Sequence, residues 1–310
     1  MGLREAILGL PFVDAVAETR RLRRARRVSG YVMESAPGHF GSPIPALNEI
    51  RRREAEIFAV PDAVAGVRIE AEPQLELVRG FADLYRDQPF GAQPRPGLRY
   101  HFENTLFSYG DALVLHCLLR SIRPRQLVEV GSGFSSAVIL DTNDGFLGGA
   151  TTCTFIDPYP QRLRALLRGD DHDRCTIVTQ PVQQVPLEVF DRLGEGDILF
   201  IDSTHVSKVG SDVNRLVFDV LPRLPAGVLV HFHDVFYPFE YPREWVYRGR
   251  AWNENYLLRA FLMFNGAFEV VLFNSYLAHF HLDAVRAVMP LWAERPGGSL
   301  WLRRLGDGPG

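Results

Sequence analysis

Residues 127–136 read LVEVGSGFSS, and this stretch decides the fold. A short apolar run ending at Val130 predicts a strand, and a Gly-x-Gly turn at Gly131 and Gly133 separates it from the start of a helix. Glycines at such a turn let a ligand approach the backbone, because no Cβ stands in the way. Doubly wound α/β sheets bind nucleotides at this point, so we expect a nucleotide-type ligand here.

Two acids around this turn narrow the ligand class. A dinucleotide site usually has a third glycine, and this chain has Ser136 in that place. Glu129 stands inside the strand just before the turn, where a carboxylate repels a pyrophosphate but suits a ligand with an amino group near its adenosine. Asp157 follows the next strand, where a carboxylate accepts the hydrogen bonds of a ribose diol. The pattern therefore disfavours a nicotinamide dinucleotide.

Outward from the turn, short apolar runs alternate with segments of helical periodicity. Between the fourth and fifth runs, apolar residues recur at helical spacing from Val209 to Leu221. Strands with little polar alternation, separated by amphipathic helices, predict an α/β fold with a doubly wound, seven-stranded, mostly parallel sheet. We expect the strands at residues 126–130, 151–156, 175–178, 197–201, 227–232, 268–273 and 299–303.

Composition excludes several classes of partner. The chain has 310 residues, 46% of them hydrophobic and 23% charged, and a net charge of −3. This balance favours neither nucleic acid nor an anionic membrane surface, and no apolar run approaches the roughly 18–20 residues of a spanning helix. The N-terminus shows no secretory signal pattern. The cysteines, Cys117, Cys153 and Cys175, lie in apolar surroundings, so we expect buried, reduced thiols in a cytoplasmic protein.

The N-terminal part differs in pattern from the rest. Helices are expected at residues 47–58 and 74–85, and the Pro- and Gly-rich residues 88–97 mark a boundary. We therefore predict a helical and irregular lid and acceptor-binding region over residues 1–95, followed by the ligand-binding domain over residues 96–310. The arginine cluster at 20–27 is interpreted as a solvated helix face, with an acidic docking partner as the alternative.

The acid before the turn, its two glycines and Asp157 together resemble the motifs of the class I S-adenosylmethionine-dependent methyltransferases. The resemblance covers about residues 100–305 and implies a Rossmann-like fold with S-adenosylmethionine as the cofactor. Residues 107–111 would close over the methionine end of the cofactor; an ordinary helix start explains them equally well. The cofactor-binding residues expected from these motifs are Glu129, Gly131, Ser132, Gly133, Ser135, Asp157, Tyr109 and Asp202.

Polar residues end the fourth and fifth strands. Asp202 and His205 follow the fourth strand, and His233 and Asp234 follow the fifth, so all four should face one crevice. They resemble the paired acids of the metal-dependent macrocin-type and catechol-type O-methyltransferases, where Asp-Asp is common after strand five. The resemblance implies a divalent metal on Asp202, His233 and Asp234. The imidazole ligand favours manganese, iron or zinc over magnesium.

A methyl acceptor must be a good nucleophile, and a metal would lower the pKa of a hydroxyl group. Without a metal, His205 or His233 would act as general base. The expected catalytic residues are His205, His233 and Asp202. We therefore expect metal-assisted methyl transfer to a hydroxyl of a small molecule, of sugar or natural-product type. A metal-free N- or O-methyltransferase and a non-catalytic cofactor-binding scaffold are the alternatives. The oligomeric state is left open, a homo-oligomer included.

Overall fold

The computed structural model describes residues 34–306, which divide between a compact unit that ends at Ile57 and one that begins at Phe58. Within the described part of the first unit lie helices α3 (Leu47–Arg52) and α4 (Glu54–Ile57). Arg53 stands between them and pairs with Glu49 and Glu56. The arginine cluster at 20–27 lies outside the described residues.

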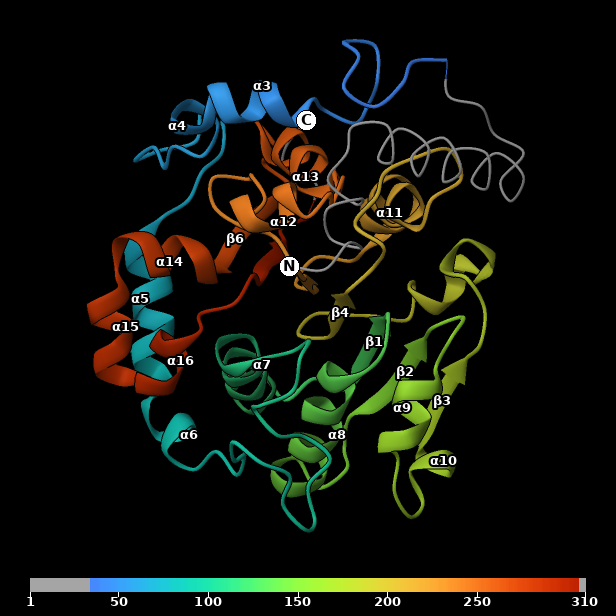
Figure 1. Cartoon of the computed structure of the whole chain (residues 1–310). Helices are drawn as coiled ribbons and strands as arrows, with labels where there is room; N and C mark the ends of the chain where they lie inside the picture. Colours follow the sequence, from blue (N-terminus) through green and yellow to red (C-terminus); the bar gives the residue numbers. More distant parts are fainter. Residues whose placement is uncertain (1–33, 307–310) are drawn as a thin grey trace, which may run out of the picture. The chain divides into compact units, whose positions relative to one another are not determined.

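The second unit contains a seven-stranded sheet in the order β3-β2-β1-β4-β5-β7-β6 (Figure 1). Strand β1 pairs in parallel with β2 on one side and β4 on the other, so the predicted doubly wound α/β sheet is confirmed. Every predicted strand is present, with ends shifted by at most about two residues. The strands are β1 (Gln126–Val130), β2 (Thr152–Ile156), β3 (Cys175–Val178), β4 (Ile198–Ile201), β5 (Leu229–Phe232), β6 (Phe268–Phe273) and β7 (Leu300–Arg304).

The sheet is mostly rather than wholly parallel, because β7 runs antiparallel to both β5 and β6. Apolar residues of the strands point to both faces and form two cores, one on each side. One core includes helices α7 (Tyr109–Ile122) and α8 (Phe134–Phe146), and the other includes α13 (Glu254–Leu262). Outside the connection between β4 and β5, the other described α-helices after β1 are α9 (Gln161–Leu166), α10 (Asp171–Arg174), α12 (Arg243–Tyr247), α14 (Asn274–Phe280), α15 (Leu282–Val288) and α16 (Pro290–Glu294).

The helix between β4 and β5 is shorter and less regular than predicted. It begins at α11 (Asp212–Asn214), continues as a π-helical stretch over Arg215–Val220, and ends in a 3-10 turn at Leu221–Arg223. Ser211 caps it, since its hydroxyl accepts a hydrogen bond from the Asn214 N–H at 3.2 Å. The predicted apolar stripe is buried from Val213 to Leu221, but its expected first position, Val209, lies before this cap and is fully exposed, so the prediction was wrong for Val209.

Residues 71–86 belong to the same compact unit as the sheet. Helix α5 (Ala71–Gly80) packs beside α15 and is followed by α6 (Ala82–Arg86) (Figure 1). The buried Gln74 accepts a hydrogen bond from the Phe273 N–H of β6 at 2.9 Å, which ties α5 to the end of that strand. The boundary between the two compact units thus falls between Ile57 and Phe58. The predicted lid and acceptor-binding region over residues 1–95 remains a prediction.

Two further expectations from composition can be compared with the described residues. No helix among residues 34–306 is long and apolar enough to cross a membrane. The three cysteines are free: Cys117 and Cys153 are buried, and Cys175 is partly buried. Burial raises the pKa of the Cys117 thiol to about 12, which keeps it protonated and unreactive near neutral pH.

Candidate active site

The glycine turn after β1 is fixed by a close backbone contact with the end of β4. Gly131 has a φ of 81°, in the left-handed region that side chains disfavour. A Cβ at this position would lie 1.9 Å from the carbonyl oxygen of Asp202. Only glycine fits here, and the contact brings the turn against the first residue after β4.

The Glu129 side chain lies in the protein interior and does not line the clefts beside this turn. Its side chain is fully buried, and its two carboxylate oxygens accept hydrogen bonds from the hydroxyls of Ser135 and Ser136. Burial raises the pKa of Glu129 to about 8, although both serine hydrogen bonds act in the opposite direction. The structure therefore places Glu129 as a residue that positions the start of α8. Its contact with a cofactor remains a prediction.

Asp157 borders a cleft beside the turn, as the ribose interpretation requires. Its Oδ2 accepts hydrogen bonds from the Ser132 N–H at 3.1 Å and the Ser132 hydroxyl at 2.7 Å, and its Oδ1 accepts one from the Tyr159 N–H at 2.7 Å. The cleft measures about 500 Å³ and is also lined by Gly131 and Ser132. This volume is within the range that holds small-molecule ligands. The residues present thus fit the adenosine half of S-adenosylmethionine.

A second cleft of about 370 Å³ adjoins the first. Asp202, Ser132 and Arg162 line both clefts, so a ligand that spans them passes Asp202. The second cleft brings together most of the predicted reactive residues with several aromatic side chains. Its other lining residues include Leu106, Phe107, Gly133, Phe134, Ser135, His205, His233, Asp234, Arg250 and Trp252.

Tyr109 does not line either cleft. Its hydroxyl donates a hydrogen bond to Glu103 at 2.7 Å, and its ring stacks on Phe102 with 4.5 Å between centroids. Tyr109 is the first residue of α7, so this part of residues 107–111 behaves as a helix start. Phe107, two residues earlier, is the member of the segment that reaches the second cleft.

The residues after β4 and β5 meet as predicted, with His205 at their centre. His205 Nε2 lies 3.4 Å from Asp202 Oδ1 and 3.7 Å from Asp234 Oδ2. On the other side of the ring, His205 Nδ1 lies 2.9 Å from Glu254 Oε2. His233 borders the same group, with its Nε2 3.7 Å from Asp234 Oδ1. The sequence analysis missed Glu254, the buried first residue of α13.

The backbone holds two of these residues in an uncommon conformation. His205 has a φ of 60° and Asp234 a φ of 56°, and non-glycine residues in this region cost about 1–3 kcal/mol each. The N–H groups of Asn253 and Glu254 donate hydrogen bonds to the His205 carbonyl oxygen at 3.1 and 3.2 Å, which fixes the turn. Backbone strain of this kind concentrates at functional sites.

The charges of the group depend on one another. Burial lowers the pKa of His205, but hydrogen bonds to Asp202 and Glu254 outweigh it and raise that pKa to about 10. Burial also disfavours charge on His233, yet Asp234 and Asp202 raise its pKa above the usual value. Burial raises the pKa of Asp234, and the two histidines only partly offset this rise. At neutral pH, His205 is therefore a cation placed between carboxylates.

This arrangement bears on the predicted metal site. Two neighbouring carboxylates usually require a cation, and here the His205 ring lies near both Asp202 and Asp234. Among residues 34–306, no group of three or more His, Cys, Asp or Glu side chains is arranged to hold a metal ion. The expected set of Asp202, His233 and Asp234 does not form one, so the residues do not fit the predicted metal.

Asn253 illustrates how a nearby polar residue can serve the fold alone. Its side-chain oxygen accepts from the Ser207 N–H at 2.6 Å, and its amide donates to the Ser207 carbonyl at 3.1 Å. These bonds hold the loop after His205 and leave Asn253 outside the reactive group. The next residue, Glu254, would have been recognisable only as an acid in the first turn of a helix.

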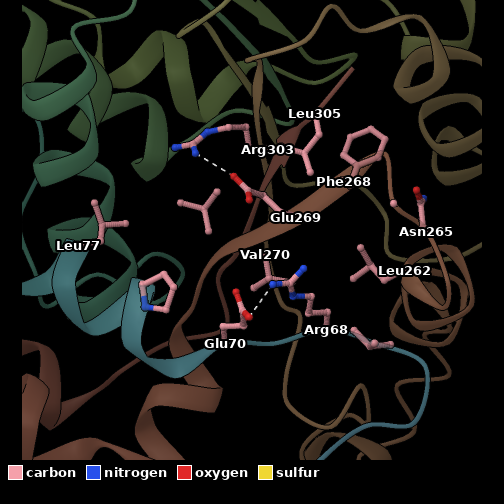
Figure 2. Close-up of a pocket in the computed structure, with 14 residues that line it drawn as sticks. Arg68, Glu70, Leu77, Leu262, Asn265, Phe268, Glu269, Val270, Arg303 and Leu305 are labelled. Atoms are coloured by element: carbon pink, nitrogen blue, oxygen red, sulfur yellow. Dashed lines mark hydrogen bonds and ion pairs between the residues drawn. The ribbon is translucent and has the colours of Figure 1, made fainter. Parts of the chain in front are cut away.

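A third pocket of about 420 Å³ lies along β6, and none of the predicted site residues lines it (Figure 2). Its charged residues pair with each other. Arg68 lies 2.7 Å from Glu70, and Arg303 lies 2.8 Å from Glu269. The pocket therefore offers a ligand no charge that lacks a partner.

Part of the chain matches a known protein family. A family of sequences described as a methyltransferase domain matches residues 128–235, which include the glycine turn, Asp157 and the four residues after β4 and β5. An uncharacterized protein of Archaeoglobus fulgidus is 38% identical over 168 residues, which are 52% of this chain and 75% of the relative. The described chain and this archaeal protein belong to one family.

Solved structures share parts of this fold. The SAH-bound methyltransferase PaMTH1 of Podospora anserina is 15% identical, with a TM-score of 0.43 over 86% of this chain and 99% of its own. The SAM-bound O-methyltransferase TomG of Streptomyces achromogenes is 14% identical, with a TM-score of 0.41 over 83% and 96%. A methyltransferase of Geobacter sulfurreducens is 17% identical, with a TM-score of 0.39 over 81% and 100%. At these scores the likenesses carry no argument about the site.

Proposed function

We propose that this chain, in which residues 128–235 match a methyltransferase domain, is a class I S-adenosylmethionine-dependent methyltransferase that methylates a hydroxyl group of a small molecule. The observation that carries the proposal is the position of His205. Its ring is held by Glu254 and lies near Asp202 and Asp234, in the cleft that adjoins the one bordered by Asp157. A methyl donor whose nucleoside lies in the first cleft would extend past Asp202 towards these residues.

The reaction is a displacement at carbon in which the acceptor oxygen forms a bond to the methyl group. The carbon–sulfur bond breaks, and its electrons remain on sulfur. The proton of the hydroxyl group goes to the Asp234 carboxylate, which is a stronger base than an ordinary aspartate because burial raises its pKa. The His205 imidazolium stabilises the negative charge that develops on the acceptor oxygen.

This assignment changes the role expected for the histidines. His205 or His233 was expected to act as general base if no metal is bound, but each faces carboxylates that favour the charged form of its ring. A protonated imidazole cannot accept the acceptor's proton. We therefore assign the base to Asp234, keep His205 as a catalytic cation, and place Glu254 as a positioning residue.

Small acceptors are favoured by the size of the site. The second cleft holds about 370 Å³ and is walled by Phe107, Phe134 and Trp252. These dimensions suit a single ring with a few substituents better than a polymer. A cytoplasmic location accords with three free cysteines and is part of the same proposal.

Metal assistance by manganese, iron or magnesium is the competing route to an activated hydroxyl. The test is methyl transfer from labelled S-adenosylmethionine to a panel of phenols, sugars and amines, run with and without EDTA. We expect methylated phenols or sugars, and rates that EDTA leaves within about twofold. Methylated amines alone would overturn the hydroxyl assignment. Activity lost in EDTA and restored by manganese would establish the metal route.

A further inference from the structure

Arg250 occupies an unusual position at the second cleft. Its guanidinium carbon lies 4.0 Å from the centre of the Trp245 ring and 4.7 Å from that of Trp252. The two indole rings are nearly perpendicular, at 85°, with centroids 5.5 Å apart. Contacts of a guanidinium with indole faces are favourable and restrict its rotamers, so Arg250 is held in place before any ligand arrives.

The Arg250 guanidinium also lacks an anionic partner within the described part of the chain. No hydrogen bond or ion pair joins it to another residue between 34 and 306; its backbone N–H bonds to the Trp245 carbonyl at 3.1 Å. Arg99 shows the contrast, because it is buried among Asp141, Asp144 and Asp171. An oriented arginine whose five N–H donors have no acceptor among residues 34–306 is suited to a ligand with two acceptor oxygens.

The charges in the second cleft determine which end of a bound acceptor lies near Arg250 and which end lies near the carboxylates. Arg250 lines the same cleft as Asp234 and His205, and its charge acts on Asp234. A ligand anion is repelled by the carboxylates and attracted by Arg250. A ligand hydroxyl is directed to the carboxylates, which accept its proton. Phe107 and Trp252 line the space between these ends.

We propose that Arg250 binds an anionic group of the methyl acceptor, so that the acceptor is a hydroxylated aromatic compound that carries a carboxylate or a phosphate ester. The inference rests on the proposed function, because it names the substrate class of the same site. Arg250 then sets the orientation of the acceptor: its anion lies against the guanidinium and its hydroxyl group faces Asp234.

Binding rather than turnover tests this inference. The protein saturated with S-adenosylhomocysteine is titrated calorimetrically with 4-hydroxybenzoate, with its methyl ester, and with phenyl phosphate. We expect at least one of the two anions to bind about tenfold or more tightly than the ester. Tighter binding of phenyl phosphate would identify a phosphate ester as the recognised group, and tighter binding of 4-hydroxybenzoate a carboxylate.

Two variants separate Arg250 from general charge effects. Arg250→Gln should weaken binding of the preferred anion about tenfold and leave the ester unchanged. Arg248→Gln removes an exposed arginine two residues away that does not line the cleft, and it should change neither. Equal binding of anion and ester, no binding of either anion, or equal effects of the two variants would overturn the inference. Titration with S-adenosylhomocysteine alone tests the cofactor cleft separately, so loss of that binding would count against the proposed function instead.

Discussion

The two clefts of this site differ in how their key contacts are specified. The first cleft is lined by segments after β1, β2, β3 and β4, and its key contacts join Ser132 to Asp157 and Gly131 to the backbone of Asp202. The second depends on His205, whose partners come from the ends of β4, β5 and the start of α13. The Ser132–Asp157 contact is therefore made by residues that directly follow two neighbouring strands, β1 and β2. The second cleft exists only when distant segments pack together.

The largest effect on the rate of methyl transfer is expected from a substitution of His205, the side chain at the centre of the second cleft. His205→Gln keeps a polar side chain of similar size but removes the positive charge between Asp202 and Asp234. We expect the rate of methyl transfer to fall about 10²- to 10⁴-fold. Affinity for S-adenosylmethionine, measured by calorimetry, should stay within about threefold. A comparable loss of cofactor affinity would show that the two clefts are not separable in this way.

The first cleft is tested by Asp157→Ala. Removal of this carboxylate takes away the proposed ribose acceptor and frees Ser132, at an expected cost of about 2–3 kcal/mol in binding. Affinity for S-adenosylmethionine should therefore fall about 30- to 150-fold by calorimetry. Asp173→Ala, an exposed aspartate of α10, serves as the control. Unchanged affinity in Asp157→Ala would refute the assigned ribose contact.

The dependence of rate on pH distinguishes the two proton assignments within the second cleft. With Asp234 as base and His205 as cation, kcat/KM falls in acid as Asp234 is protonated, at a pH above the usual aspartate value. It also falls in alkali as His205 loses its proton, near pH 10. A histidine base would instead make the rate rise through the His205 pKa. The groups that face this ring are Asp202, Asp234, Glu254 and His233.

Among these variants, Glu254→Gln should have the smallest effect on the rate and the most specific effect on its pH dependence. It retains the shape of the Glu254 side chain but removes one of the carboxylates that raise the pKa of His205. The alkaline limb should move to lower pH by about one unit, with a rate loss of only about tenfold at neutral pH. If the alkaline side of the pH–rate profile does not shift, in a variant with the melting temperature of the wild type, Glu254 has a purely structural role.

The sequence predicted best the features that depend on residues close together in the sequence. The strands were recognisable from local apolar runs, and the glycine turn and Asp157 from their places beside strand ends. Asp202, His205, His233 and Asp234 were also expected to meet, because neighbouring parallel strands end at one edge.

The partners of these residues were not predictable in the same way. The metal expectation followed from two close carboxylates, but it did not foresee that the His205 ring would take the place beside them. Glu254 is separated from His205 by the whole of β5 and its following loop, and only folding makes them neighbours. Tyr109 is the first residue of α7, as the alternative of an ordinary helix start had it, and its hydroxyl group donates to Glu103 instead of reaching either cleft.

The contact between Gly131 and Asp202 has a consequence for how such a site can change over generations. A side chain at position 131 would meet the carbonyl oxygen of residue 202, which belongs to the backbone and is present in every amino acid. No second substitution at position 202 can therefore restore what is lost by replacing the glycine. Gly131 must therefore be retained for as long as the ends of β1 and β4 meet in this way, while the aromatic residues around the second cleft can change with the acceptor.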